Sequence, residues 1–548
     1  MRAILPLITL LAPTFFLSAC AVNSCGAEPL ARPNILLILA DDLGFSDLAC
    51  YGSEIATPNL DRLATRGLRF TQFYNCARCC PTRAALLTGL YPHQAGVGHM
   101  LGNWHAPGYT AGLNDQCATI AELLHHVGYR TYHIGKWHVG GVGAAKNARN
   151  HPMNRGFDGA YGTGGGGNYF GLRPLYLDRE DVEPGADFYA TDAFTDYAVK
   201  FLAEHGREHQ NAPFFLHLCY TAPHFPLHAL PEDIARYRGK YRDGWDRLRG
   251  RRFAKQKELG IFGKETILSP RDPVARAWAD VPEAERGEWD LRMAVYAAMI
   301  DRLDQGVGRV LEAVRQIGAE QNTLVLFLSD NGASAEFLDT WPNPARGHKP
   351  GSQTGTRESH RCLEVGWANA ANTPFREHKM WVHEGGIATP LIASWPAGIP
   401  SPGKLTPEVG HVIDFMPTCL ELAGGQYPRT LRGRDLTPLP GKSLVAVLKG
   451  GQSGERMLGW EHEGNRAFRS GDWKVVAGFR GEWELYNLKF DRSELTNLAD
   501  RNQAKCKELA DAWQRWADQA GVVAWEKLPG ASYKPSAQYR KKSEPVSP

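Results

Sequence analysis

The chain has 548 residues, of which 43% are hydrophobic and 22% are charged. These proportions are typical of a packed globular protein, and they exclude a disordered chain, a coiled coil and a collagen-like fibre. The 62 Lys and Arg residues against 59 Asp and Glu residues give a net charge of +3. We therefore expect no nucleic-acid partner, because such proteins carry a strong basic excess. Eleven Cys residues are too dilute for a small disulfide scaffold.

The N-terminus has the pattern of a secretory signal. Arg2 precedes an apolar stretch over residues 3–17, which is shorter than the about 20 residues that a membrane-spanning helix needs. Residues 17–20 (LSAC) resemble a bacterial lipobox, which predicts cleavage before Cys20 and a lipid anchor on Cys20. Ordinary cleavage after Ala21 is the alternative, so residues 1–27 are assigned to a signal and leader. No later segment looks membrane-spanning, and we expect an exported protein that is periplasmic, tethered to the cell envelope or secreted.

The rest of the chain alternates apolar strands with helical patterns. The run NILLILA over residues 34–40 predicts a strand buried on both faces of a parallel sheet. Further strands are predicted over 131–134, 214–219, 324–328 and 390–395. Helices are predicted over 57–67 (with capping residues), 84–90, 118–127 and 291–317. This alternation indicates an α/β fold with a large mixed, mostly parallel sheet sandwiched by helices.

The C-terminal part of the chain has a different pattern. Short strand-like pieces and turns over 468–488 predict a small antiparallel sheet, and a helix is predicted over 502–520. We divide the chain into a main α/β domain over 30–430, a C-terminal subdomain over 431–525 and an extended tail over 526–548. The charge-dense stretch 231–284 is predicted to be a surface insertion.

Two acidic pairs follow predicted strands. Asp41-Asp42 come directly after the strand over 34–40, and Asp330-Asn331 follow the strand over 324–328. Each pair alone is more often a turn than a site. Ligands of α/β sheets lie beyond the carboxyl ends of the strands, which suggests that the two pairs converge. Because they offer only oxygen ligands, they would select Ca²⁺ or Mg²⁺.

The sharpest motif is Cys79-Cys80-Pro81-Thr82-Arg83, followed by Leu-Thr-Gly at residues 87–89. It resembles the Cys-x-Pro-x-Arg signature of type I sulfatases, in the alkaline phosphatase-like superfamily. Five other segments resemble that family in the same order: 33–44 (with ADDLG), 135–138 (GKWH), 222–224 (APH), 329–332 (SDNG) and Lys379 before 384–386 (EGG). Residues 44–47 (GFSD) and 55–59 (IATPN) are similar to the bacterial arylsulfatase branch. Six motifs in order make this resemblance far more specific than any one of them.

The resemblance implies a formylglycine at position 79, made from Cys79 by a formylglycine-generating enzyme. One hydroxyl of its hydrate would attack sulfur, and the other would later lose its proton and expel sulfate. It also implies one Ca²⁺, held by Asp41, Asp42, position 79, Asp330 and Asn331, that polarises the nucleophile and anchors a sulfate oxygen.

The resemblance also assigns roles to the remaining catalytic residues. Arg83 would hold the nucleophile, and Asp330 would act as its base. Lys136 and Lys379 would bind the sulfate and the leaving-group oxygen. His138 would accept the proton of the second hydroxyl.

Two histidines complete the expected substrate contacts. His224 would donate a proton to the departing alcohol or phenol and would contact substrate. His93, and with it His99, follows the signature closely and is expected to line the pocket. Glycines within residues 162–167 fit G-x-G-x-x-G without the strand and helix that a dinucleotide site needs, so a flexible loop near the pocket is expected.

The function implied is hydrolysis of aryl or carbohydrate sulfate esters. A phosphonate monoester or phosphodiester hydrolase of the same superfamily is an alternative, and a non-catalytic protein that binds sulfated glycans is another. Substrate choice is expected to depend on residues 231–284 and 334–376. Cys80, next to Cys79, could form a disulfide with Cys76 in an oxidising compartment.

Overall fold

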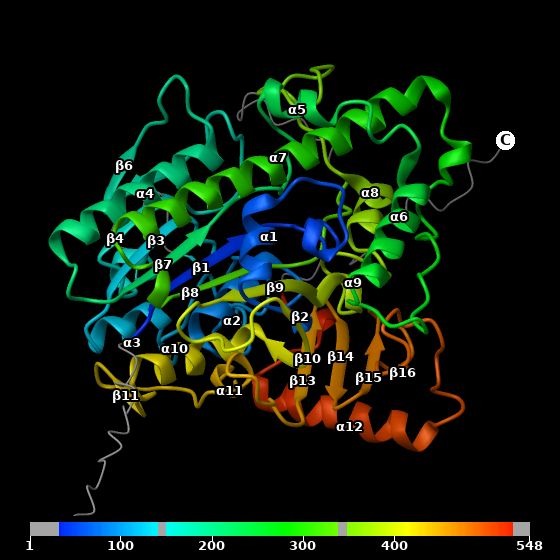
Figure 1. Ribbon diagram of the computed structural model, residues 1–548. Helices are drawn as coiled ribbons and strands as arrows, with labels where there is room; N and C mark the ends of the chain where they lie inside the picture. The colour runs from blue at the N-terminus through cyan, green and yellow to red at the C-terminus, as the bar shows by residue number, and fades with distance from the viewer. Residues whose placement is uncertain (1–31, 141–148, 338–347, 530–548) are drawn as a thin grey trace, which may run out of the picture. The chain divides into compact units, whose positions relative to one another are not determined.

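The computed structural model describes residues 32–140, 149–337 and 348–529. Its centre is a ten-stranded sheet with the strand order β10-β2-β9-β8-β1-β7-β3-β4-β5-β6 (Figure 1). The five central strands from β8 to β4 pair in parallel, whereas β9, β5 and β6 pair antiparallel to their neighbours. The predicted fold class, a mixed and mostly parallel sheet with helices, is confirmed.

The strands of this sheet are β1 (Asn34–Ala40), β2 (Leu68–Tyr74), β3 (Arg130–Lys136), β4 (Gly159–Thr163), β5 (Leu175–Leu177), β6 (Glu180–Val182), β7 (Phe214–Cys219), β8 (Thr323–Ser329), β9 (Ala388–Ser394) and β10 (Lys404–His411). Strand β1 lies between β7 and β8, and all its residues after Asn34 are buried. A central strand is covered on both faces, which is why its sequence is continuously apolar and does not alternate.

Helices cover both faces of the sheet. One side carries α1 (Pro58–Thr65), α4 (Ala190–Glu208) and α7 (Glu283–Gln316), and the other carries α2 (Cys79–Thr88), α3 (Ile120–His126) and α10 (Phe415–Ala423) (Figure 1). The shorter helices are α5 (Pro231–Tyr237), α6 (Gly244–Glu258), α8 (Glu364–Ala371), α9 (Glu384–Ile387) and α11 (Val445–Leu448). Short 3-10 turns occur at Ala49–Tyr51, Pro152–Asn154, Trp278–Asp280, Glu320–Asn322, Val412–Asp414 and Trp525–Lys527.

The predicted elements are present, with different ends. Helix α2 begins at Cys79, five residues before the predicted start, because Pro81 lies in its first turn, where a missing N–H costs no helical hydrogen bond. Helix α1 ends at Thr65, and the Thr57 side chain forms no capping hydrogen bond, so the predicted cap is wrong. Instead, the Thr57 hydroxyl donates to Asp61 and accepts from the backbone of Ala49.

Residues 231–284, predicted to be a surface insertion, lie mostly at the surface, but part of the segment is buried. This segment contains α5 and α6, and α6 packs Trp245 and Arg252 into the interior. Arg252 lies 2.6 Å from Asp47 and 2.9 Å from Glu54. Charge density gave no sign of this buried part, because a paired arginine can be buried although an unpaired one rarely is.

The C-terminal region forms the predicted small antiparallel sheet with a helix against it. Its strands are β13 (Met457–His462), β14 (Asn465–Ser470), β15 (Trp473–Ala477) and β16 (Glu484–Asn487), and its helix is α12 (Gln503–Ala520). A separate two-stranded ribbon consists of β11 (Thr430–Leu431) and β12 (Arg434–Asp435). The sheet starts eleven residues before the predicted position.

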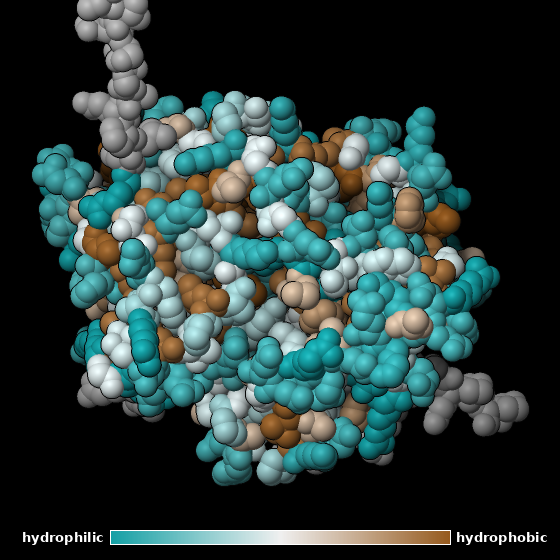
Figure 2. Space-filling view, turned by 90° about the horizontal axis from the view of Figure 1, so that it is seen from below, coloured by the Kyte–Doolittle hydropathy of each residue, from teal (hydrophilic) through white to brown (hydrophobic). Residues whose placement is uncertain are grey.

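Hydrophobic side chains gather in the interior. Figure 2 shows one face on which hydrophilic residues predominate and hydrophobic residues occur in small, separate groups. Within the described residues, no helix combines the length and the apolar character required to cross a membrane.

Candidate active site

The acidic pairs and two of the predicted basic residues lie at one edge of the central sheet. Asp41 and Asp42 follow β1, and Asp330 and Asn331 follow β8. Lys136 is the last residue of β3, and His224 comes five residues after β7. Because β1, β3, β7 and β8 are parallel, their carboxyl ends meet at this edge. The expected convergence of the two acidic pairs is confirmed.

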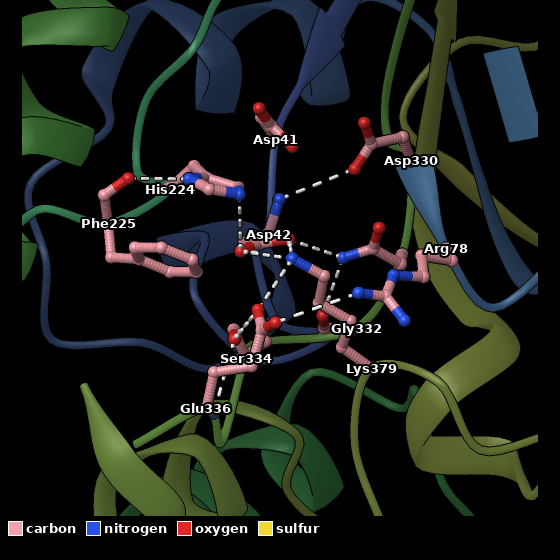
Figure 3. A network of polar contacts seen from close by, with 12 residues as sticks. Asp41, Asp42, Arg78, His224, Phe225, Asp330, Gly332, Ser334, Glu336 and Lys379 are labelled. Carbon is pink, nitrogen blue, oxygen red and sulfur yellow. Dashed lines mark hydrogen bonds and ion pairs between the residues drawn. The ribbon is translucent and has the colours of Figure 1, made fainter. Parts of the chain in front are cut away.

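Ion pairs connect the carboxylates of β1 to lysines from distant segments. The Lys136 ammonium lies 2.6 Å from Asp41 Oδ2, and the Lys379 ammonium lies 3.0 Å from each oxygen of Asp42 (Figure 3). Asn331 Nδ2 donates to Asp42 Oδ1 at 2.6 Å. Burial alone would raise the pKa of Asp41, but Lys136 most of all, with His224 and Arg83, lowers it to about 2. Asp41 is therefore ionised at neutral pH.

Several buried oxygens of this cluster have no donor. Asp41 Oδ1 and Asn331 Oδ1 accept no hydrogen bond from any described residue. Both residues are fully buried, and an unpaired buried acceptor costs free energy. Together with the carboxylates of Asp42 and Asp330, these oxygens form the donor set that hard cations prefer. The residues present therefore fit a Ca²⁺ or Mg²⁺ ion.

Arg83 binds the other acidic residue. Its Nε and Nη2 atoms lie 2.9 and 2.7 Å from Asp330 Oδ2, and its Nη1 donates to the carbonyl of Lys136 at 2.6 Å. Burial, reinforced by the charge of Asp41 and opposed by Arg83, raises the pKa of Asp330 well above its usual value. Burial thus disfavours the charged form of Asp330, and a divalent cation bound beside it would favour the carboxylate.

Cys79 is the first residue of α2 and is buried beside Lys136 and His138. A hydrogen bond from Cys80, opposed by burial and supported by the charges of Lys136 and His138, holds the pKa of Cys79 well below its usual value. The N-terminal end of a helix also favours negative charge. Position 79 therefore lies where an anionic atom is stabilised.

Two histidines, His224 and His138, lie in the site. His224 Nδ1 donates to the carbonyl of Phe225 at 2.5 Å, so Nε2 is the atom that points to Asp42, at 3.6 Å (Figure 3). Hydrogen bonding at one ring nitrogen fixes which nitrogen exchanges a proton with the site. Burial, opposed by Cys79, lowers the pKa of His138, which favours the neutral imidazole.

The backbone around the site is strained. Asp42, Ala77, His138 and Met380 have φ values of 66°, 63°, 55° and 82°. Non-glycine residues in this left-handed region cost of order 1 kcal/mol each and are concentrated at functional sites.

A cavity of about 220 Å³ opens over these residues. Its walls are Arg78, Cys79, Met100, Lys136, His138, Gly166, Gly167, His224, Phe225, Pro226, Glu336, His348, His360 and Lys379. Glu336, His348 and His360 come from the region 334–376 that was expected to contact substrate. Sequence reasoning missed them individually, as well as Arg78, because no motif marks them.

Glu336 places a carboxylate in the cavity. It lies 3.0 Å from the Lys379 ammonium and 3.7 Å from Arg78, and it accepts from the Ser334 hydroxyl at 2.9 Å (Figure 3). Burial would raise the pKa of Glu336, but Lys379 and Arg78 lower it to about 2. The cavity therefore offers an acceptor as well as cations.

Other sequence expectations fail here. His93 does not line the cavity, because its Nε2 lies 2.8 Å from Glu461 and its ring packs edge-on against Tyr109. Residues 231–284 contribute no described wall residue. Gly166 and Gly167 line the cavity as expected, but Gly162 belongs to strand β4.

The expected cysteine pairing also fails. All nine described cysteines are free, so Cys76 and Cys80 form no disulfide. Cys20 lies outside the described residues.

The family model described as Sulfatase matches residues 33–425. This chain belongs to the sulfatase family. A second model, described as N-sulphoglucosamine sulphohydrolase, C-terminal, matches residues 377–519. Members of the sulfatase family hydrolyse sulfate esters, and this chain is accordingly a sulfuric ester hydrolase.

The chain is similar over most of its length to curated sulfatases. It is 36% identical to an uncharacterized sulfatase of Schizosaccharomyces pombe, covering 90% of this chain and 94% of the relative. It is 34% identical to an arylsulfatase of Klebsiella aerogenes, with 76% and 92% covered. Among solved structures, Ps i-CgsB in complex with k-i-k-neocarrahexaose has 27% identity, a TM-score of 0.66, and coverage of 94% and 98%.

Proposed function

We propose that this sulfatase hydrolyses the sulfate ester of a phenol or a sugar, with formylglycine at position 79 as nucleophile and one Ca²⁺ in the oxygen cluster. The observation that carries the proposal is the position of Cys79, at a helix N-terminus beside Lys136 and His138. The whole set of six motif segments that resembles the type I family supports it. The formylglycine would come from a formylglycine-generating enzyme of the same cell.

The oxygens of Asp41, Asp42, Asp330 and Asn331 would hold the ion, together with position 79. When bound, Ca²⁺ supplies positive charge to a sulfate oxygen and to the nucleophile. Formylglycine supplies, as its hydrate, a second hydroxyl that allows the covalent sulfate ester to be released without attack by water.

Lys136 and Lys379 would bind the sulfate group. Their ammonium groups are buried and point into the cavity region, and burial strengthens their attraction for an anion. In the absence of substrate they pair with Asp41 and Asp42. Arg83 would keep Asp330 ionised and oriented, and Asp330 would accept the proton of the attacking hydroxyl.

His224 and His138 would move the remaining protons. His224 donates through Nδ1 to a carbonyl, so only Nε2 can deliver a proton to the departing alcohol or phenol. Nε2 lies 3.6 Å from Asp42, at the edge of the oxygen cluster where the ester would bind. His138 would accept the proton of the second hydroxyl, because its imidazole is kept neutral by burial.

The cavity walls indicate the leaving group. The ring of Phe225 stacks on His224 with centroids 4.2 Å apart, and the rings of His348 and His360 stack at 4.3 Å. Flat surfaces of this kind pack against an aryl or sugar ring. Glu336 could accept a hydrogen bond from a hydroxyl group next to the ester. A sulfated sugar or phenol fits both features.

We also propose that the protein acts outside the cytoplasm, in the periplasm, in the envelope or as a secreted enzyme. The support is the signal pattern in residues 1–27, which lie outside the described residues. Mass spectrometry of the mature N-terminus tests it: a lipidated Cys20 supports the lipobox, and a chain beginning at Val22 supports ordinary cleavage after Ala21.

The test of the reaction uses protein produced with a formylglycine-generating enzyme. We expect hydrolysis of 4-nitrophenyl sulfate that is lost in Cys79→Ala and on chelation, and that Ca²⁺ restores. A matched control is Cys76→Ala, which removes a buried thiol outside the cavity. Fully converted protein that cleaves bis(4-nitrophenyl) phosphate but no sulfate ester would overturn the proposal, and binding of sulfated polysaccharide without turnover would do the same.

A further inference from the structure

A second cluster of potential metal ligands lies at the turn between β13 and β14. His462 and Asn465 face each other across the strands, and Glu463 and Gly464 form the two-residue turn with φ values of 51° and 80°. This turn brings the Glu463 carboxylate to His99, which lies in the segment after α2. His99 Nδ1 and His462 Nε2 are each 3.6 Å from Glu463 Oε1.

The cluster contains unsatisfied polar atoms. His462 is fully buried, and neither of its ring nitrogens has a hydrogen-bond partner among the described residues. His99 Nδ1 and Glu463 Oε2 are also buried without one. Leaving a buried polar group unpaired costs free energy, so several such groups in one place require an explanation. A cation bound by these atoms would remove the cost.

We propose that His99, His462 and Glu463 bind a second metal ion, a divalent transition metal with Zn²⁺ as the best match. The three ligand atoms lie within 4.8 Å of one another. Two imidazoles and one carboxylate are typical zinc ligands, whereas Ca²⁺ and Mg²⁺ prefer all-oxygen sites. The ion would join the β13–β14 turn to the segment after α2.

The surroundings hold the ligands in place. The His99 ring packs edge-on against Trp104 and Trp525, with centroids 4.8 and 4.7 Å apart. Glu463 Oε1 accepts from Arg78 Nη1 at 2.6 Å, which fixes the orientation of the carboxylate beside the two histidines. A ligand whose orientation is fixed beforehand loses little freedom when the ion binds.

One cation is shared by two carboxylates next to the cluster. Arg78 lies 2.6 Å from Glu463 and 3.7 Å from Glu336, so its single positive charge is divided between them.

A third cluster, His133, His217 and Cys219, has a similar composition but does not need an ion. His133 Nδ1 and His217 Nδ1 lie 3.1 Å apart, and His217 Nε2 lies 3.0 Å from Cys219 Sγ. Its members therefore bond to one another, whereas neither ring nitrogen of His462 has a partner among the described residues. This cluster is a useful internal control.

The experiment uses the full chain carrying Cys79→Ala. This change removes a ligand from Cys79, Cys80 and His138, another group that could bind a transition metal. Excess Ca²⁺ in the buffer keeps the added metal away from the oxygen cluster. We expect one equivalent of Co²⁺ to bind with the visible absorption of a nitrogen-containing tetrahedral site, and Zn²⁺ to displace it. Zn²⁺ should raise the unfolding midpoint by several degrees. The readout does not depend on activity, so it is separate from the test of the proposed function.

Variants then locate the ion. His462→Gln and Glu463→Gln should each weaken Zn²⁺ binding at least tenfold, and Glu463→Gln retains a carbonyl oxygen for Arg78. His93→Gln and His217→Gln, which alter other buried histidines, should bind normally. If His462→Gln fails to fold, Glu463→Gln and the Co²⁺ spectrum of the parent decide the question. Failure to bind Co²⁺ and Zn²⁺, or binding that only His217→Gln removes, overturns the proposal.

Discussion

Two buried clusters of charged residues in this protein differ in whether their oxygens have hydrogen-bond donors. At the edge of the central sheet, oxygens of Asp41 and Asn331 have no donor among the described residues. At Glu384, the first residue of α9, both carboxylate oxygens have a donor. Lys474 lies 3.0 Å from Oε1, whereas Arg492 and the Tyr74 hydroxyl each lie 2.9 Å from Oε2.

The presence or absence of donors for the buried oxygens distinguishes a cluster that can bind a ligand from one that only connects parts of the fold. The Glu384 cluster connects the central sheet to the C-terminal sheet, since Tyr74 ends β2 and Lys474 lies in β15. Its charges neutralise one another, so nothing further needs to bind. The cluster at the edge of the central sheet has acceptors without donors, which a cation could bind, and in the proposed function its lysines would bind an anion.

The largest effect is expected from Asp330→Asn. The change keeps the shape of the side chain but removes the charge that would bind the ion and accept the proton. We expect kcat/KM for 4-nitrophenyl sulfate to fall at least about 10²–10³-fold. The unfolding midpoint of the metal-free protein should decrease only moderately, because the amide oxygen still accepts a hydrogen bond from the buried Arg83 and burial disfavours the Asp330 carboxylate. A stability loss as large as the loss in activity would show that Asp330 is structural.

The matched change in the other cluster is Glu384→Gln. It leaves the Lys474 and Arg492 charges buried with one partner fewer, which costs about 3–5 kcal/mol of unfolding free energy. We expect urea denaturation to show this loss, while kcat/KM of the folded fraction stays within about threefold. An unchanged stability would contradict the distinction between the two clusters.

The difference in unfolding free energy between the wild type and Glu384→Gln should depend on pH. Burial would raise the pKa of Glu384, but Lys474 and Arg492 lower it to about 2, from 4.5. A lowered carboxylate pKa stabilises the native state above pH 4.5, and this contribution is lost as the pH falls from 4.5 toward 2. The stability difference between the wild type and Glu384→Gln should therefore shrink over that range in urea titrations. A difference that grew on acidification would have the wrong sign.

The smallest effect is expected from His93→Gln. His93 binds Glu461 outside the cavity, so kcat/KM should stay within about twofold. Loss of the buried hydrogen bond should lower the unfolding free energy by about 1–3 kcal/mol. His224→Gln is the contrast, with a large loss of activity on a poor leaving group. A tenfold loss of activity in His93→Gln would return this residue to the catalytic machinery.

The sequence by itself determined five of the ten strands of the central sheet (β1, β3, β7, β8 and β9), the order of the motifs and the acidic pairs. A continuous apolar run such as residues 34–40 predicts a central strand because burial on both faces leaves no polar position. The ends of β1 and β8 then predict where Asp41, Asp42 and Asp330 meet. These inferences depend only on residues that are close together in the sequence. They hold because the pattern of apolar residues in a short segment indicates whether a strand is buried and where it ends.

Only the tertiary structure decided which side chains complete the cavity. Glu336, His348 and His360 come from an irregular segment whose path has no periodicity to read, and Arg78 precedes the signature without any distinguishing pattern. His93 lies near the signature in sequence, yet Glu461 of β13 binds it elsewhere. Arg252 lies in a charge-dense stretch, yet Asp47 and Glu54 allow its burial. In each instance the partner is distant along the chain, and packing between distant segments fixes the direction of the side chain.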